Sequence, residues 1–245
     1  MPLIAKTTPK LTIAVDNAPP YGVVNVNGEV AGVMVDIIRQ MQRYIDFKLE
    51  YVACPFLRCL TMLEQNKVDI MGGLIRTKER EQVMQFVVPP YMILSSSFVF
   101  YARSDSEINI NQYHDLLDKK IAVMRGAAHF PKFDNDTRLN KVEALSEANA
   151  FDMLLKQRVD LVIAVEETAD HSTHVLNRPA QQFIKMPYRF SGNIYGHMAF
   201  SKQFAKTDMA EEIIRLMQQF ARTGQLTELV KPYNLPAIKS ENVGL

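Results

Sequence analysis

Residues 67–91 read KVDIMGGLIRTKEREQVMQFVVPPY, and they are the most informative part of the chain. The apolar start, with Val68, Ile70 and Met71, predicts a buried strand that ends at two glycines. Glycines at a strand end let the backbone approach a ligand closely, because no Cβ stands in the way. Thr77 predicts the N-cap of a short helix. We therefore place the candidate function at this junction of strand and helix.

Arg80 falls in the first turn of that helix. The helix dipole favours anions in the first turn, so an arginine gains nothing from the helix there. A planar guanidinium at such a junction suits a carboxylate, which it can bind through two parallel hydrogen bonds. The alternative is an ion pair with a surface Glu or Asp, because most arginines are solvated. On these residues alone both roles stay open.

Length and composition are those of a globular protein. The chain has 245 residues, 47% hydrophobic and 22% charged, which is enough for one large domain or two ordinary ones. A net charge of +1 gives no electrostatic footprint for nucleic acid, and no apolar run approaches the length of a membrane span. Because phosphate-binding, dinucleotide-binding and nucleophile-elbow motifs are missing from the sequence, we expect no cofactor and no catalytic residue, and we expect no metal site either.

Cys54 and Cys59 are the only cysteines. A disulfide requires Cys54 to precede the helix that contains Cys59, because two positions five residues apart within one helix are too distant. We expect two buried free thiols. The cysteines do not decide the compartment.

Strands alternate with helices along the chain, which predicts mostly parallel sheets covered on both faces by helices. Leu57, Leu60 and Leu63 are expected on the buried face of the second helix. A loop is expected from Asp16 to Gly28. The expected strands cover residues 11–15, 48–53, 68–71, 120–124 and 141–145. The expected helices cover residues 33–45, 55–65 and 146–157, and residues 208–230 are expected to form a helix that ends at Gly224, followed by a segment at residues 226–230.

One unit of helix, turn and strand occurs twice. Residues 63–71 read LEQNKVDIM and residues 154–162 read LLKQRVDLV, with Val-Asp at the same place in each. Two similar α/β lobes are therefore predicted. Extended apolar segments at residues 95–102 and 193–201 would cross between the lobes.

These crossings divide the chain into a discontinuous lobe 1, residues 1–101 plus 197–245, and a lobe 2, residues 102–196. Two crossovers suit a hinge. A ligand would lie at the carboxyl ends of the strands of both sheets.

Residues 67–91 resemble the signature of family 3 extracellular solute-binding proteins: a G-x-x-D turn, a strand, a T-x-E-R helix start and F-x-x-P-x-Y. The resemblance extends over about residues 10–234, including a C-terminal helix pair with the pattern G-x-x-x-x-L-x-x-x-Y. It implies the α/β, two-lobed type II periplasmic-binding fold, with two crossover hinge segments. It also implies a periplasmic location. The sequence itself does not indicate export, because MPLIAKTTPK at residues 1–10 lacks the features of a signal peptide.

In the amino-acid binders of this family the arginine of the T-x-E-R turn holds the ligand carboxylate, and this sequence supplies Arg80. The resemblance also implies an aromatic cover at Phe56 or Tyr21, for which ordinary core packing is an equal alternative. The residues expected at the ligand are Asp16, Tyr21, Phe56, Gly73, Leu74, Ile75, Arg80, Arg125, Gly126, Ala127, Ala128 and Glu166.

The sequence departs from the family pattern at three places. Ile75 replaces a hydroxyl residue. Gly126-Ala-Ala128 lacks another hydroxyl at the expected start of a lobe 2 helix, where backbone amides could still face an anion. Val165 stands where the family has the carboxylate that pairs with the ligand ammonium. Glu166 follows it, but adjacent side chains of a strand point to opposite faces, so Glu166 replaces that carboxylate only if the strand end bulges.

A buried zwitterion without a partner for its ammonium would lose solvation energy that nothing restores. Ordinary α-amino-acid binding is therefore in doubt, and we expect a small carboxylated ligand. Arg58, Arg76 and Arg125 favour a more anionic one. Arg58 and Arg76 are alternatively solvated, or paired with Glu64 and Glu79.

We therefore predict a monomeric, hinge-closing solute-binding protein that delivers its ligand to a membrane permease of an ABC transporter. One alternative is a ligand-sensing module that docks on a membrane receptor. A less favoured alternative is an enzyme similar to cyclohexadienyl dehydratases, which share the fold. That chemistry needs a positioned general acid, and Glu166 is the single obvious lobe 2 candidate.

Overall fold

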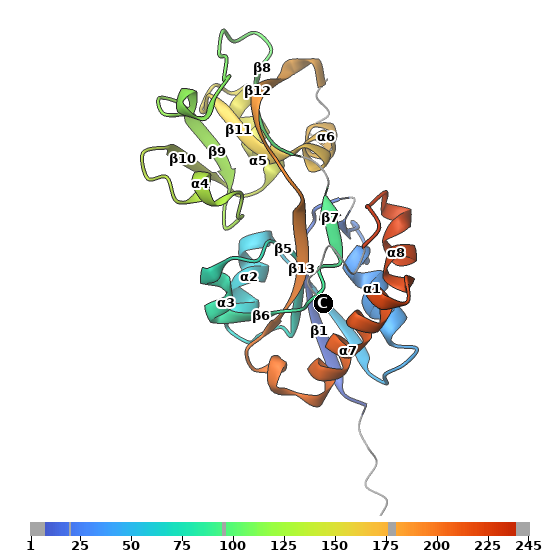
Figure 1. Cartoon of the computed structure of the whole chain (residues 1–245). Coiled ribbons are helices and arrows are strands. Elements are labelled where there is room, and N and C mark those ends of the chain that lie inside the picture. The colour runs from blue at the N-terminus through green and yellow to red at the C-terminus, as the bar shows by residue number, and fades with distance from the viewer. Residues whose placement is uncertain (1–7, 20, 95–96, 176–179, 239–245) are drawn as a thin grey trace, which may run out of the picture. The chain divides into compact units, whose positions relative to one another are not determined.

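The computed structural model describes residues 8–19, 21–94, 97–175 and 180–238 (Figure 1). Contacts divide the chain into two compact units. Unit 1 contains the described chain up to Cys54, residues 58–93 and the chain from Tyr195, and unit 2 contains residues 55–57 and 94–194. The chain thus passes from one unit to the other after residues 93 and 194. The sequence had predicted these two crossings after residues 101 and 196.

The sheet of unit 1 has the order β4-β1-β5-β13-β6 among the described residues, with β7 paired to β13. Its first three strands are parallel, and β13 runs antiparallel to β5 and β6. The strands are β1 (Lys10–Val15), β4 (Lys48–Ala53), β5 (Ile70–Leu74), β6 (Met84–Phe86), β7 (Met92–Leu94) and β13 (Ile194–Ser201).

Helices cover both faces of this sheet. Figure 1 shows α2 and α3 on one side of it and α1, α7 and α8 on the other. The helices are α1 (Val33–Met41), α2 (Phe56–Glu64), α3 (Lys78–Val83), α7 (Asp208–Arg222) and α8 (Gln225–Val230), with 3-10 turns at Phe204–Lys206 and Lys231–Tyr233. Buried apolar residues at helical spacing explain α1, whose stripe runs from Val33 to Met41.

Three expectations for the chain up to the end of α2 were wrong. The expected loop from Asp16 to Gly28 contains β2 (Gly22–Val24), which pairs with β3 (Val30–Gly32) as a hairpin. Helix α1 ends at Met41, four residues before the expected end. Leu57 is 38% exposed, because the buried stripe of α2 consists of Cys59, Leu60 and Leu63.

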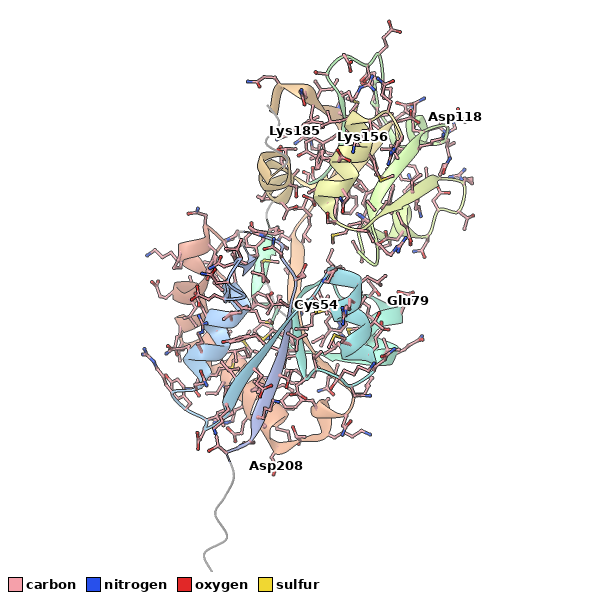
Figure 2. The ribbon with its side chains drawn as sticks, turned by 180° about the vertical axis from the view of Figure 1, so that it is seen from behind. Cys54, Glu79, Asp118, Lys156, Lys185 and Asp208 are labelled. Carbon is pink, nitrogen blue, oxygen red and sulfur yellow. A yellow bond between two sulfur atoms is a disulfide. The ribbon has the colours of Figure 1, made fainter. Side chains whose placement is uncertain are left out.

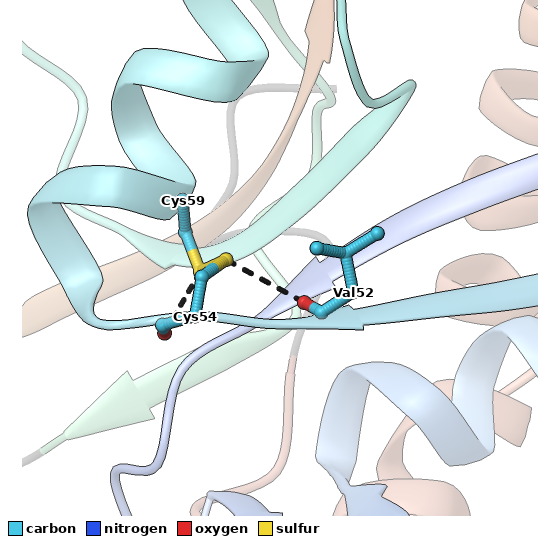
Figure 3. Close-up of a disulfide and its surroundings, with 3 residues drawn as sticks. All are labelled: Val52, Cys54 and Cys59. Atoms are coloured by element: carbon cyan, nitrogen blue, oxygen red, sulfur yellow. Dashed lines mark hydrogen bonds between the residues drawn. A yellow bond between two sulfur atoms is a disulfide. The ribbon is translucent and has the colours of Figure 1, made fainter.

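Cys54 and Cys59 form a disulfide (Figure 3). The expectation of two free thiols was therefore wrong. Helix α2 begins at Phe56, so Cys54 lies before it, and the two Cα atoms are 5.4 Å apart, within the range that a disulfide spans. Both cysteines are buried, and the Sγ atom of Cys59 lies 3.0 Å from the carbonyl oxygen of Cys54.

The sheet of unit 2 has the order β10-β9-β11-β8-β12. Strands β10, β9 and β11 are parallel, whereas β8 is antiparallel to both of its neighbours. The strands are β8 (Ser97–Arg103), β9 (Lys120–Met124), β10 (Asn140–Ala144), β11 (Leu161–Val165) and β12 (Phe183–Ser191). The helices are α4 (Pro131–Asp134), α5 (Glu147–Leu155) and α6 (Glu166–Val175), with 3-10 turns at Tyr113–Leu116 and Ala180–Gln182.

The repeated sequence motif has the same backbone geometry in both units. Asn66 after α2 has a φ of 56°, and Gln157 after α5 has a φ of 57°. Both residues adopt the left-handed conformation that ends many helices. The predicted α/β architecture with two similar units is thus confirmed.

Candidate functional site

Arg80 lies at the start of α3, where the sequence predicted it. The Thr77 side chain caps the helix, because its Oγ1 accepts a hydrogen bond from the Arg80 backbone N–H at 3.3 Å. The Arg80 side chain is buried, with 8% exposure, and its Nη1 donates to the Ile75 carbonyl at 2.7 Å. Arg80 is therefore not a solvated surface arginine. Its guanidinium lies against the segment that follows the two glycines.

The glycine pair at the end of β5 is tightly packed on one side. A Cβ on Gly72 would lie 2.5 Å from the Met34 Sδ and 2.6 Å from the Tyr91 Oη, so a larger residue does not fit. Gly73 is exposed and has a φ of +72°, which L-residues rarely adopt. Leu74 is fully buried, so its side chain faces the core. The backbone at Gly73 is thus open to a ligand.

Asp16 directly follows β1, the strand beside β5. Burial raises the pKa of Asp16 to about 6, and a hydrogen bond to its own backbone opposes this rise. Burial also raises the pKa of Tyr91, with a further rise from the nearby Asp16 charge. No cation of the described chain contributes to the pKa of Asp16. Such a carboxylate would gain stability from a cationic ligand group.

The two candidate aromatic residues are both half-buried. Phe56 is the first residue of α2 and lies inside the loop that the disulfide closes. Tyr21 lies in the turn before β2, and its carbonyl accepts from the Val33 N–H at 3.0 Å. Their contact with a ligand stays a prediction.

The arginines proposed as additional anion ligands have carboxylate partners in two cases. The guanidinium of Arg76 pairs with Glu81, not with Glu79, and both side chains are largely exposed. In unit 2, Arg125 is exposed and its Nε donates to Glu143 at 2.8 Å. Arg58 is exposed on α2.

The expected helix start at Gly126-Ala-Ala128 was wrong. Gly126 lies in a turn, Ala127 and Ala128 have no regular secondary structure, and the Ala127 N–H already donates to the Met124 carbonyl at 3.0 Å. The next helix, α4, begins only at Pro131, a residue that suits the first turn of a helix. The helix dipole that we expected at these amides is therefore not available.

Val165 is the last residue of β11, and Glu166 begins α6. The Glu166 carboxylate lies 2.8 Å from the Nζ of Lys185, labelled in Figure 2, and 3.5 Å from the Nη1 of Arg189. Lys185 in particular holds the pKa of Glu166 below its usual range. Glu166 thus has two cationic partners on β12, within its own unit.

Glu147 is a second, partly buried carboxyl group that the sequence did not indicate. It accepts hydrogen bonds from Ser172 Oγ at 2.7 Å and from Thr168 Oγ1 at 2.9 Å, so it links α5 to α6. Burial raises the pKa of Glu147 to about 7. Its partners lie more than twenty residues away, and no local pattern predicts them.

Two α/β units connected by two chain crossings are the architecture of hinged binding proteins. The chain belongs to the bacterial extracellular solute-binding proteins, family 3, whose model matches residues 11–236. None of the described helices has the length and apolar character that crossing a membrane requires.

Relatives and solved structures agree with this family. The chain is 23% identical over 217 residues to a probable amino-acid-binding protein, YxeM, of Bacillus subtilis, covering 84% of this chain and 77% of the relative. It is also 23% identical to y4tE of Sinorhizobium fredii, a probable amino-acid ABC transporter periplasmic-binding protein, covering 91% and 76%.

Among solved structures, a mutant of ArgBP from T. maritima has the same fold, with a TM-score of 0.73, 23% identity, and coverage of 91% and 94%. A histidine kinase sensor domain with similarity to periplasmic binding proteins has a TM-score of 0.78, 18% identity, and coverage of 95% and 98%.

Proposed function

We propose that this protein binds a small carboxylated solute, an amino acid or a close relative, and delivers it to an ABC permease in the periplasm. The observation that carries the proposal is Arg80. The Arg80 side chain is buried at the start of α3, and its Nη1 donates to the Ile75 carbonyl, two residues after Gly73. A ligand carboxylate is the planar anion that a guanidinium binds best.

Asp16 is the proposed partner for a cationic group of the ligand. It belongs to the same unit as Arg80, and it lies at the end of the strand next to the glycine pair. The carboxylates of unit 2 near the strand ends are already engaged, Glu143 by Arg125 and Glu166 by Lys185. An ammonium or guanidinium group would therefore be held by Asp16.

Relatives support an amino-acid ligand. Both curated relatives are named as probable amino-acid binders or transporters, and solved structures of the same fold include ArgBP bound to arginine. Arginine carries both a carboxylate and a second cation, so it is the first ligand to test here. Closure of the two units on the ligand requires the ligand to bind the closed state more tightly than the open state.

A sensing role is the second candidate function, because the fold also matches the histidine kinase sensor domain. In that role the closed protein would be recognised by a membrane receptor instead of a permease. Catalysis is not part of either proposal, since the family consists of binding proteins.

A thermal-shift screen of the wild-type protein tests the proposal. The ligands are L-arginine, L-lysine, L-glutamine, L-glutamate, succinate, citrate, spermidine and glucuronate. A ligand at 100 times its Kd adds about 2.7 kcal/mol of stability, which raises Tm by several degrees. A shift with one or more carboxylated ligands, and none with spermidine, is expected. A shift with spermidine alone would contradict the proposed role of Arg80.

A further inference from the structure

Tyr91 is the last residue of the stretch 67–91, and the sequence analysis assigned it no contact with a ligand. It is 2% exposed and precedes β7 in unit 1. Its backbone N–H donates to the Gly196 carbonyl at 3.1 Å, which ties it to β13. The Tyr91 ring is therefore buried within unit 1, and its hydroxyl lies at the end of β5.

The Tyr91 hydroxyl contacts both glycines of the site. It accepts a hydrogen bond from the Gly73 backbone N–H, an interaction that opposes the rise of its pKa. Its oxygen lies 2.6 Å from the position that a Cβ on Gly72 would occupy, and 4.0 Å from that position on Gly73. One phenol therefore determines the packing of Gly72 and the hydrogen bonding of Gly73.

We propose that Tyr91 is a positioning residue that fixes the peptide between Gly72 and Gly73 in its ligand-binding orientation. Two consecutive glycines have more backbone freedom than any other pair, so this segment would otherwise sample many conformations. A bound N–H on Gly73 fixes the plane of that peptide. Ligand affinity then gains because the backbone is ordered before the ligand arrives. This inference rests on the proposed function of the same site.

The contributions of Asp16 and Tyr91 to ligand affinity can be separated by their dependence on pH. The charge of Asp16 acts on Tyr91, and burial raises the pKa of Tyr91 well above its ordinary value. Tyr91 therefore keeps its proton over the whole working range, and its effect on affinity should not depend on pH. Asp16, with a pKa of about 6, should give an effect that does.

The test compares Tyr91→Phe with Tyr113→Phe. Both substitutions keep a buried ring and remove a bonded hydroxyl. Tyr113 is 8% exposed and lies in unit 2, where its Oη donates to the Lys132 carbonyl at 3.0 Å or to Asp136 at 3.1 Å. It is therefore a matched control for the loss of a buried phenol hydrogen bond away from the glycines.

Two readouts are needed. Hydrogen exchange of the Gly73 amide, followed by NMR in protein labelled with 15N-glycine, reports the bond itself. Calorimetric titration with L-arginine, L-glutamine and succinate at pH 5 and pH 8 reports affinity. In Tyr91→Phe we expect roughly tenfold faster Gly73 exchange and about tenfold weaker binding at both pH values, with a Tm change no larger than that of the control.

The inference is overturned if Gly73 exchange is the same in Tyr91→Phe as in the wild type. It is also overturned if the affinity loss does not exceed that of Tyr113→Phe. If wild-type protein binds none of the three probes, the proposed function is contradicted for these ligands. Gly73 exchange then still decides whether Tyr91 fixes this peptide.

Discussion

Asp69 and Asp160 make the same hydrogen bond in the two units. The Asp69 carboxylate accepts the Thr12 backbone N–H at 2.8 Å, and the Asp160 carboxylate accepts the Lys120 backbone N–H at 2.7 Å. In each unit the aspartate follows a helix and binds the adjacent parallel strand near its start. The aspartate of the Val-Asp repeat therefore has the same role in both units: its side chain caps the start of the adjacent strand and so holds the helix–turn–strand element against the sheet.

Removal of this cap should destabilise the protein. Asp69→Ala leaves the Thr12 N–H without its partner, which costs about 1–3 kcal/mol of unfolding free energy. Asp160→Ala should cost somewhat less, because its bond is more exposed. Asp118→Ala, at an exposed position labelled in Figure 2, is the control. Urea denaturation measures all three, and equal stability of Asp69→Ala and Asp118→Ala would refute the cap.

Glu147 should make stability fall as the pH rises. Its folded pKa of about 7 lies above the ordinary value of 4.5, so the folded protein binds the proton more tightly than the unfolded chain does. Its contribution is fully present below about pH 4.5 and is lost as the pH rises through 7.

Glu147→Gln removes this dependence. Relative to the wild type, the variant should gain roughly 2 kcal/mol of unfolding free energy between pH 4.5 and pH 8, after allowance for partial exposure of the carboxyl group. Glu212→Gln, at a carboxyl group whose side chain is 46% exposed, is the control. Parallel stability curves for Glu147→Gln and the wild type over this pH range would show that the carboxyl does not titrate as proposed.

Asp16 should make binding of a cationic ligand depend on pH. Its pKa of about 6 means that it is mostly neutral at pH 5 and ionised at pH 7.5. The affinity for L-arginine should therefore rise about tenfold over this interval in the wild type and stay constant in Asp16→Asn. The unfolding free energy of the ligand-free protein should instead fall as the pH rises from about 4 to 6. The reason is that the folded protein binds the Asp16 proton more tightly than the unfolded chain does.

Isothermal titration with L-arginine and with succinate measures this dependence. Succinate lacks a cation and is the control ligand. An arginine affinity that is independent of pH in the wild type would remove Asp16 from the ligand site.

The disulfide should contribute measurably to stability. It closes a loop of six residues, for which the chain-entropy relation gives about 2 kcal/mol. The double substitution of Cys54→Ser and Cys59→Ser should lower Tm, and a reducing agent should then have no further effect. Wild-type protein with the same Tm as the double variant under oxidising conditions would contradict the pairing.

Local signals in the sequence predicted the elements that depend on residues close together in the chain. The caps at Thr77 and Ser146 and the strand at residues 120–124 follow from short-range patterns and were confirmed. The hairpin of β2 and β3 was missed because each strand has three residues, too few for a periodic signal.

Features that depend on distant residues could not be predicted. The partners of Glu166 lie 19 and 23 residues away on β12. The burial of Arg80 and the raised pKa of Asp16 follow from packing, which the order of residues does not reveal. At 126–128 the resemblance to the family suggested a helix start, whereas the next helix, α4, begins at Pro131.

The most direct measurement is calorimetric titration of Arg80→Lys and Arg80→Gln with the strongest ligand of the panel. Arg215→Gln, which removes an exposed arginine paired with Glu212 on α7, is the matched control. Because Arg80 also donates to the Ile75 carbonyl, the folded state of each variant is first verified by its Tm. The proposal predicts a loss of about 2–4 kcal/mol of binding free energy in both Arg80 variants and none in Arg215→Gln. Wild-type affinity in a folded Arg80→Gln protein would show that the ligand carboxylate is not held by Arg80.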